Sequence, residues 1–386
     1  MSVYLILNPT RTGVVPNYRL AATNWWILQP VYGMGTGGFL YFPQFIIFFT
    51  PFNLIRPEIF GEILWRAFGF GLFGSALWMI AEWPQGPGAL QNPRAFCRDA
   101  GLTSTAFLFL VLLAVPASLA SLSNGQTNLP LSACLVFAVF SVRSEKWIWA
   151  SLCLWLAVIL KPIALAPWLL AFASFPQIRK PLLLGIIPFF LMGLAHLDFH
   201  YASERWVKCL EKIFRSYNPE NLRVSDLFGM LEKAGVSSSP LVNSVTRALA
   251  CFGALVWVRR SYRRNGLASS AWALWVATAM VFTIFNPRVE TNSYVLISPL
   301  LGFQAISLWR EEGGSSWKAW VLAAACLGLM CDGMGLWIYK ATDVWLKPLI
   351  VIMVSPLLLR MPQEWGTGGG KGENSVGTHS PSRACG

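Results

Sequence analysis

The stretch WIWASLCLWLAVILKPIALAPWLLAFASF, residues 147–175, contains a single charged side chain, that of Lys161. About 20 apolar residues are enough for an α-helix to cross the hydrocarbon core of a bilayer. Lys161-Pro162 interrupts the run near its centre, and proline removes a backbone donor and disturbs a continuous helix. The stretch therefore predicts two membrane-embedded helices, Trp147–Leu160 and Ile163–Phe175, which form a broken pair around Lys161.

The composition of the whole chain agrees with this interpretation. Of its 386 residues, 55% are hydrophobic and only 12% are charged, and the mean hydropathy is +0.52. Soluble globular proteins carry about 25% charged residues, so this chain has too little polar surface to remain in water. The composition predicts a polytopic integral membrane protein.

Further predominantly apolar runs of helix length lie along the chain: Phe39–Ile55, Ile59–Ala81, Leu102–Ser121, Leu129–Val142, Leu182–Leu197, Leu241–Val258, Leu267–Phe285, Tyr294–Trp309, Trp317–Ile338 and Val344–Leu359. We expect an all-α fold, a bundle of about 10–12 transmembrane helices with short extracytoplasmic helices. Pro43, Pro51 and Pro116 allow a re-entrant or incomplete span. The topology of the first spans is therefore left open.

The net charge of +12 does not indicate a nucleic-acid partner, because the Lys and Arg residues are spread through short loops, where they orient a membrane protein. The eight Cys include no C-x-x-C pair, and only three His are present. Neither a disulfide framework nor a metal site is expected. The chain also contains no Walker sequence, so no ATP-driven step and no cofactor are expected.

Basic loops are retained on the cytoplasmic side of a membrane. The loops assigned there are Arg143–Lys146, Gln177–Lys180 and Val258–Arg264. Counting the predicted spans outward from these loops brings four polar segments together on the extracytoplasmic face: Ser123–Asn128, Lys161-Pro162, Asp198–Pro240 and Asn286–Thr291. We expect a functional site where these segments meet.

The insert 198–240 carries six basic and six acidic residues and is neutral overall. Glu204 and Lys208, and Glu211 and Arg215, have the i,i+4 spacing and the order that support a helix. We expect an amphipathic helix at the membrane interface, then a second helix near Ser225–Ala234 with a cap from Ser225-Asp226-Leu227. The Gly- and Ser-rich tail from Gly366 onward is expected to be disordered.

Lys161 and Arg288 are the cations best suited to a site on the extracytoplasmic face. A lysine inside a membrane marks a functional site by default, although a lysine at a hairpin tip can also extend to the interface. Arg288 either pairs with Glu290 in an ordinary loop or binds an anionic headgroup through its fork of donors. Glu62 and Arg66, four residues apart, predict a self-neutralised pair at the interface.

Four stretches resemble, in order, the motifs of glycosyltransferase family 87, the polyprenyl-phosphate-mannose-type transferases of the GT-C fold. The first is similar to a Tyr-x-Pro … Pro … Leu-Trp run, here Tyr41, Pro43, Pro51, Pro57, Leu64 and Trp65. The second matches a Gly-Gln-x-Asn segment, at Gly125, Gln126 and Asn128. The third is a Lys-Pro hairpin at Lys161-Pro162, and the fourth is FNPRVETNSYVLISP, residues 285–299.

The resemblance implies transfer of a hexosyl group from a polyprenyl-phosphate sugar to a glycan or glycolipid acceptor on the extracytoplasmic face of the plasma (inner) membrane. Lys161 and Arg288 would then hold the donor phosphate, and Gln126 and Asn128 would bond to sugar or acceptor hydroxyls. Substrate-binding roles are also assigned to Arg19, Tyr41 and Asn292. The implied partners are the lipid-linked donor, the acceptor and membrane lipid.

The sequence offers several candidates for the catalytic base. The family places an acid in the first extracytoplasmic loop, where a carboxylate accepts the acceptor's proton, but Asn17 stands at the corresponding position here. An amide cannot act as a general base near neutral pH. Glu290, Glu58 or Asp198 would serve instead, or Asn17 merely orients the acceptor, or the chain is catalytically silent.

The predicted organisation has five parts: a first extracytoplasmic loop (1–38), an N-terminal transmembrane bundle (39–197), the polar insert (198–240), a C-terminal transmembrane bundle (241–360) and a tail (361–386). The span that the family places before the first loop is not found ahead of it, which suggests a start placed too late or a truncation. Two other functions stay open: a non-catalytic protein that binds lipid-linked sugar, and a transporter or flippase of lipid-linked glycans.

Overall fold

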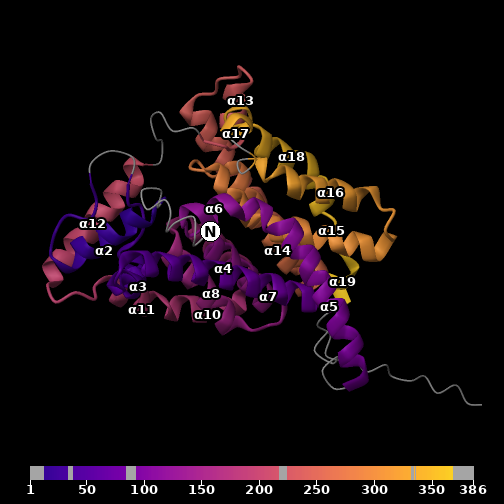
Figure 1. Cartoon of the computed structure of the whole chain (residues 1–386), viewed down its shortest axis with the longest axis horizontal. Coiled ribbons are helices and arrows are strands. Elements are labelled where there is room, and N and C mark those ends of the chain that lie inside the picture. Colours follow the sequence, from indigo (N-terminus) through magenta and orange to yellow (C-terminus); the bar gives the residue numbers. More distant parts are fainter. Residues whose placement is uncertain are drawn as a thin grey trace, which may run out of the picture.

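The computed structural model describes residues 13–33, 38–83, 93–216, 224–331, 334 and 336–367. Every regular element in these ranges is helical, so the all-α prediction is confirmed (Figure 1). Residues 1–12 and 34–37 of the predicted first loop, and residues 368–386 of the predicted tail, lie outside the described residues.

The first group of helices is drawn in indigo to magenta in Figure 1. It contains α2 (Val15–Trp26), α3 (Pro43–Leu54), α4 (Glu58–Glu82), α5 (Pro93–Ala114), α6 (Leu119–Asn124), α7 (Asn128–Arg143), α8 (Trp147–Leu160), α9 (Leu165–Ser174), α10 (Pro176–Leu184) and α11 (Ile186–Gly193), with the 3-10 turns η3 (Pro116–Ser118) and η4 (Pro162–Ala164). The expected broken pair is confirmed, because α8 ends at Leu160 and the chain resumes as η4 and α9 after Lys161.

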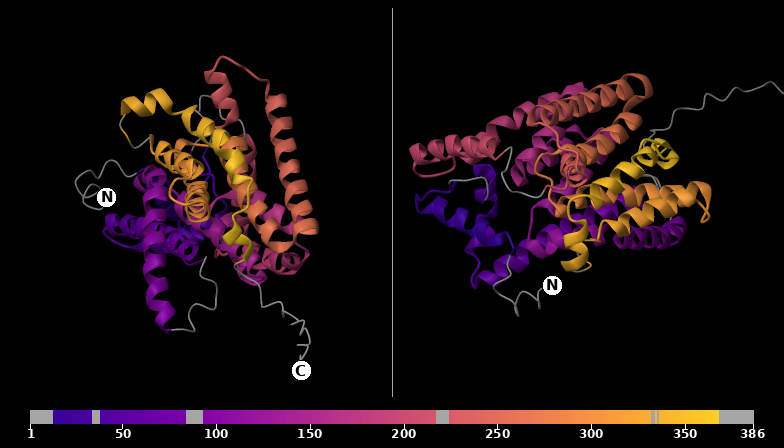
Figure 2. Two further views of the ribbon diagram at one scale, coloured as in Figure 1. Left: turned by 90° about the vertical axis from the view of Figure 1, so that its right-hand side faces the viewer. Right: turned by 90° about the horizontal axis from the view of Figure 1, so that it is seen from above.

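The second group comprises α12 (Phe199–Arg215), α13 (Leu227–Lys233), α14 (Pro240–Met280), the π-helical turn η5 (Val281–Phe285), the 3-10 turn η6 (Thr291–Leu296), α15 (Ser298–Glu312), α16 (Trp317–Gly328), α17 (Leu336–Thr342), α18 (Leu346–Leu358) and α19 (Gln363–Thr367). Figure 2 shows the long helix α14, in salmon to orange, running along one side of the molecule.

Some of the described helices are candidate membrane spans. Among the described residues, α4 and the continuous α14–η5 segment are long and apolar enough to cross a bilayer. The pair Ser104–Ala114 and Pro116–Asn124 forms a third candidate, bent by 45°, and the break falls at Pro116, where proline cannot continue the backbone ladder. Shorter apolar helices accompany these: α7, α8, η4 with α9, α16 and α18. The total of ten to twelve spans stays a prediction.

Two predicted loops are helical instead. The segment Gln177–Lys180 lies inside α10. The sequence predicts a loop at the basic cluster Val258–Arg264, but helix α14 continues through this cluster and bends at Gly266, where φ is +79°. Arginine is a good helix former, whereas glycine adopts positive φ without a steric cost. The two predicted helices of this region are therefore both present, and the break between them lies at Gly266 instead of in the basic cluster.

The polar insert forms the two predicted helices. Helix α12 begins after Asp198, whose side chain accepts a hydrogen bond from the Tyr201 amide, and α13 begins after Asp226, which accepts one from the Gly229 amide. The charged pairs on α12 differ from those expected: Glu204 pairs with Arg205, and Lys208 pairs with Glu211 at 3.2 Å. The predicted cap of the second helix is confirmed.

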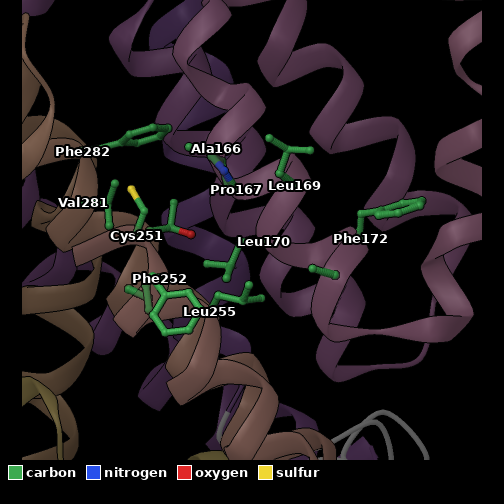
Figure 3. Close-up of a pocket in the computed structure, with 14 residues that line it drawn as sticks. Ala166, Pro167, Leu169, Leu170, Phe172, Cys251, Phe252, Leu255, Val281 and Phe282 are labelled. Carbon is green, nitrogen blue, oxygen red and sulfur yellow. The ribbon is translucent and has the colours of Figure 1, made fainter. Parts of the chain in front are cut away.

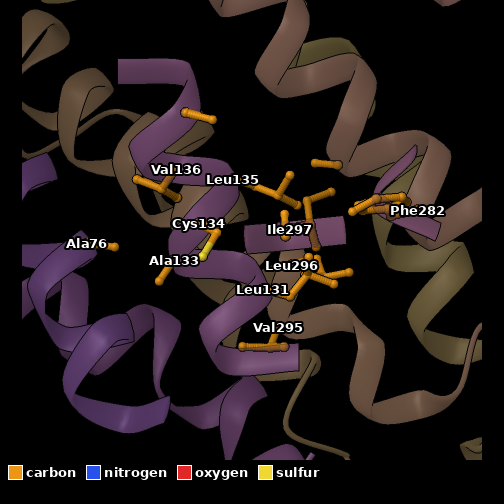
Figure 4. Close-up of a cluster of buried hydrophobic side chains, with 14 of the residues drawn as sticks. Ala76, Leu131, Ala133, Cys134, Leu135, Val136, Phe282, Val295, Leu296 and Ile297 are labelled. Atoms are coloured by element: carbon orange, nitrogen blue, oxygen red, sulfur yellow. The ribbon is translucent and has the colours of Figure 1, made fainter. Parts of the chain in front are cut away.

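Helix α7 is the central helix of the bundle. All its residues except Phe137 and Ser141 are buried, as expected of a helix that is apolar on every side. Figure 4 shows Leu131 and Leu135 of α7 facing Leu296 and Ile297, and facing Phe282 beyond them. The Ser132 hydroxyl also donates to the Val295 carbonyl at 3.2 Å. This packing sets the first turn of α7 beside the first turn of η6.

The chain is also ordered beyond the predicted start of the tail at residue 361. Trp365 of α19 is fully buried, its indole donates to the Ala268 carbonyl at 2.8 Å, and its own carbonyl accepts two bonds from Arg143. Its ring is surrounded by five others: Trp83, Phe140, Trp272, Trp275 and Phe303. The folded part of the chain therefore extends through α19.

Candidate functional site

The polar segments that the sequence places on one face do meet. The Ser121 hydroxyl donates to the Asn292 carbonyl at 2.7 Å, which joins the end of α6 to η6. The Arg288 guanidinium donates to the Ser216 carbonyl at the end of α12 at 2.7 Å. The Ser225 amide donates to the Val289 carbonyl at 2.8 Å. The predicted convergence of these segments is confirmed.

A line of hydrogen bonds connects Lys161 to Glu290. Lys161 Nζ donates to Asn128 Oδ1 at 2.8 Å, Asn128 Nδ2 donates to Gln126 Oε1 at 2.7 Å, and Gln126 Nε2 donates to Glu290 Oε2 at 2.8 Å. An ammonium can only donate and a carboxylate can only accept, so the two ends determine the orientation of both amides. We call these four residues the polar relay.

The loop before α7 holds Gln126 in place. Gly125 ends α6 with φ +64°, and a Cβ atom there would lie 2.4 Å from Val15 Cγ2, so only glycine fits. The Trp65 indole donates to the Gly125 carbonyl at 2.8 Å. Gly125 and Trp65 belong to two of the motifs quoted above. Those motifs therefore shape the loop that carries the relay.

The Glu62–Arg66 pair supports the same loop. The two side chains form the predicted ion pair, at 3.1 Å, with only 6% and 4% of their surfaces exposed. Arg66 also donates to the Ser123 carbonyl at 3.4 Å. Because each charge is compensated, the pair can lie inside the helical bundle.

Glu290 is exposed, and its carboxylate influences two cations electrostatically. Burial lowers the pKa of Lys161, while the Glu290 carboxylate raises it and Arg288 lowers it. Burial also lowers the pKa of Arg288, and Glu290 raises it. The three charges therefore act on one another. The backbone amide of Arg288 donates a hydrogen bond to Asn286 Oδ1 at 3.2 Å, which restrains this loop. The arrangement offers one carboxylate next to two groups that can bind an anion.

Two tyrosines extend the site, and one of them, Tyr18, is a residue that sequence reasoning missed. The Tyr18 and Tyr41 hydroxyls are 2.7 Å apart. Burial raises the pKa of both phenols, and the Glu290 carboxylate raises each of them further. The buried Thr127 hydroxyl, between Gln126 and Asn128, lies at the same two phenols, and hydrogen bonding to it lowers the pKa of each. The position of Thr127 inside the Gly-Gln-x-Asn segment is the sequence feature that could have identified it as a site residue.

Asn17 and Arg19 both lie on α2, next to this site, but one side chain is exposed and the other is buried. Asn17 is exposed in the first turn of α2, and this turn is fixed to the polar loop by the bond from the Val14 amide to the Asn124 carbonyl, 3.0 Å. Arg19 is buried and instead donates to the Glu58 carbonyl at 3.1 Å. Asn292 is buried below the relay, and its Oδ1 lacks a partner within the described part of the chain.

The structure does not bring the other two candidate acids to the relay. Asp198 caps α12, next to His196, whose ring contacts those of Trp25 and Trp26 at the end of α2. The start of α2 lies at Asn124, so about 18 Å of helix, at 1.5 Å per residue, separates the two regions. Glu58 pairs with Arg56 and Arg19. Of the three candidate acids, Glu290 is the one joined to Gln126.

An apolar crevice begins near the site. It has a volume of about 410 Å³ and is lined by α9, α14 and η5. Figure 3 shows Ala166 and Phe282 at one end and Phe252 and Leu255 at the other. Ala166 follows Lys161 by five residues and Phe282 precedes Asn286 by four, so the first end lies toward the relay. The exposed side chains of Leu169 and Phe252 leave the crevice open at its side.

Comparison with known proteins identifies the family of the chain. Residues 39–299 match glycosyltransferase family 87, which is more than half of the 386 residues. The matched range contains the whole polar relay, Tyr41, Arg288 and Asn292, whereas Asn17 and Arg19 precede it. No curated protein matches the chain. The chain therefore belongs to glycosyltransferase family 87, a membrane family of the GT-C fold.

Proposed function

We propose that this protein transfers a hexosyl group from a polyprenyl-phosphate sugar to a glycan or lipid acceptor on the extracytoplasmic face of the plasma (inner) membrane, with Glu290 as the general base. The observation that carries the proposal is the polar relay, because it holds an exposed carboxylate at 2.8 Å from Gln126 beside two cations. Family membership supports a glycosyl transfer, and the donor, sugar and acceptor are part of the proposal.

In the proposed reaction, Glu290 accepts the proton of the acceptor hydroxyl while the hydroxyl oxygen forms a bond to the anomeric carbon of the donor sugar. The bond between that carbon and the phosphate oxygen breaks, and its electron pair leaves with the phosphate. Lys161 and Arg288 stabilise the negative charge on the leaving group, since donors placed before the reaction need no reorganisation during it. The Gln126 bond orients the Glu290 carboxylate for this step.

The apolar crevice supports a lipid-linked donor. It lies between α9 and α14, its lining is almost wholly hydrocarbon, and one end lies at Ala166, five residues after Lys161. A polyprenyl chain in this crevice would leave its phosphate at the two cations. The open side of the crevice would let the chain enter from the bilayer without leaving an apolar environment.

The test uses purified protein in detergent with radiolabelled polyprenyl-phosphate hexoses and a total lipid extract as acceptor. We expect release of polyprenyl phosphate with at least one hexose. Glu290→Gln should lower the rate by about 10²–10⁴-fold, the usual contribution of a general base. Lys161→Ala and Arg288→Ala should abolish turnover. Glu232→Gln on α13 and Lys208→Ala on α12 are matched controls, because both side chains are exposed.

An unchanged rate in the Glu290→Gln variant would refute Glu290 as the base. An unchanged rate in the Lys161 or Arg288 variant would refute the phosphate site. No release with any donor, together with no donor binding, would refute the transferase. Movement of a labelled polyprenyl sugar across proteoliposomes without bond cleavage would instead support a flippase.

A second candidate is a protein that binds lipid-linked sugar without transferring it. The observation in its favour is Asn17, an exposed amide in the helical turn next to the polar loop, at the position where the family resemblance leads us to expect an acid. If the native chain has no activity and Asn17→Asp acquires it, this second function is correct and Glu290 is not sufficient as a base.

A further inference from the structure

Lys347 is a fully buried lysine outside the segment that matches the family. It lies in the first turn of α18, its exposed fraction is 0%, and the family match ends at residue 299. Burying an ammonium group is costly unless hydrogen bonds and charges compensate it. A methionine would fill a similar space in a membrane bundle without that cost. We therefore expect the ammonium group of Lys347 to have a specific structural or functional role.

The amine is directed at the backbone next to Glu290. Lys347 Nζ donates to the Thr291 carbonyl at 2.8 Å and lies 5.9 Å from the centre of the Tyr294 ring. Thr291 follows Glu290 directly and begins η6. A bond to this carbonyl therefore restrains the peptide unit that comes immediately after the proposed base.

Other elements hold the same segment from different directions. The Val289 carbonyl accepts from the Ser225 amide, and the Asn292 carbonyl accepts from the Ser121 hydroxyl. The Tyr294 hydroxyl bonds to the Ser225 carbonyl at 2.7 Å and to the Thr283 carbonyl at 3.0 Å. The backbone around the exposed Glu290 is thus held by neighbours on both sides, and Lys347 is the one charged side chain among these donors.

We propose that Lys347 is a positioning residue, which holds the Glu290–Thr291 backbone so that the Glu290 carboxylate stays on Gln126 and faces the acceptor. The inference rests on the proposed function, since it takes Glu290 as the base. Lys347 itself touches neither substrate. A loss of about 1 Å in placement can lower a rate by about 10²-fold, so the effect should appear in kcat and not in donor affinity.

The test is a double-mutant cycle with Lys347→Met and Glu290→Gln, measured with the polyprenyl-phosphate hexose that supports turnover. Lys347→Met should lower kcat by about 10- to 100-fold and leave the donor KM within about 3-fold. It should have no further effect on the residual rate of Glu290→Gln, because a residue that acts through Glu290 has nothing left to position. Lys340→Met, an exposed lysine on α17, is the matched control.

Hydrogen exchange gives a readout that does not depend on catalysis. Amides of residues 289–294 should exchange faster in Lys347→Met than in the native chain or in Lys340→Met. If Lys347→Met does not fold, Lys347→Gln replaces it in both measurements, because this variant removes the charge and shortens the reach to the Thr291 carbonyl while it keeps a polar side chain. Its effect on kcat should also vanish in the Glu290→Gln background.

The outcomes separate the two proposals. A native kcat in a folded Lys347→Met protein, effects that multiply with Glu290→Gln, or unchanged exchange at 289–294 would overturn the positioning role alone. If Glu290→Gln itself keeps the native rate, the proposed base is wrong, and the positioning role is overturned with it. If Lys347→Gln is the variant measured, the same three results overturn the role.

Discussion

The ion pair between Asp226 and Arg247 should be a main determinant of stability on the side of the molecule that carries the site. Arg247 Nη2 lies 2.7 Å from Asp226 Oδ2, and the two side chains are 11% and 0% exposed. The other carboxylate oxygen accepts from the Gly229 amide at 2.8 Å and caps α13. The pair connects the polar insert to α14, and Asp226 is adjacent to Ser225, which bonds to Val289.

The expected cost follows from the burial of both charges. Asp226→Asn keeps an oxygen for the cap but leaves the Arg247 cation buried without its partner, which should cost about 3–5 kcal/mol. Asp226→Ala also removes the cap and should cost about 1 kcal/mol more. The double variant Asp226→Leu with Arg247→Met removes both charges together. It should regain most of the loss, because two apolar side chains do not require a partner.

Thermal unfolding in detergent measures these differences. A chain of this length should lose about 2 °C per kcal/mol, at the low end of the range for domains, so Asp226→Asn should lower Tm by roughly 6–10 °C. The double variant should lie within a few degrees of the native chain. A shift below about 2 °C for Asp226→Asn, or a double variant as unstable as the single one, would refute the reasoning.

Three further predictions concern other parts of the molecule. Gly125→Ala should lower both Tm and turnover, since the new Cβ would lie 2.4 Å from Val15 Cγ2 at a φ of +64°; native values of both would contradict this account of the loop. Polyprenyl phosphate should slow maleimide labelling of Cys251, which lines the crevice and is exposed, whereas inorganic phosphate should not; equal labelling rates would argue against a lipid in the crevice. Burial raises the pKa of Glu364 above its ordinary value of 4.5, so the folded state binds this proton more tightly and Tm should fall as pH rises above 4.5 through the raised pKa. Glu364→Gln should flatten that slope, and an unchanged slope would assign it to other groups.

The helices and the meeting of the polar segments were accessible from the sequence. Runs of apolar residues mark membrane helices because a bilayer tolerates few charges, and the basic segments at Arg143, Gln177 and Arg259 were enough to place Gln126, Lys161 and Glu290 together. The position of the late kink in α14 was not accessible, because a basic cluster is compatible with both a loop and a helix. The backbone conformation of Gly266 sets the position of the kink.

The individual roles within the site depend on contacts between segments far apart in the chain. The sequence does not distinguish the three candidate bases, Glu290, Asp198 and Glu58, since each is a carboxylate near a polar segment. Their difference lies in what each side chain contacts: Glu290 accepts from Gln126, Asp198 caps α12, and Glu58 pairs with two arginines.

The sequence by itself determined that this is an all-helical membrane protein whose polar loops gather around Lys161. The reason is that the composition of each segment reflects whether it contacts lipid or water. Only the tertiary structure decided that the Glu290 carboxylate lies at the end of the polar relay and that Lys347 reaches the backbone beside it. Hydrogen bonds of 2.8 Å depend on the relative placement of helices. That placement is set by packing around α7, which no single stretch of sequence encodes.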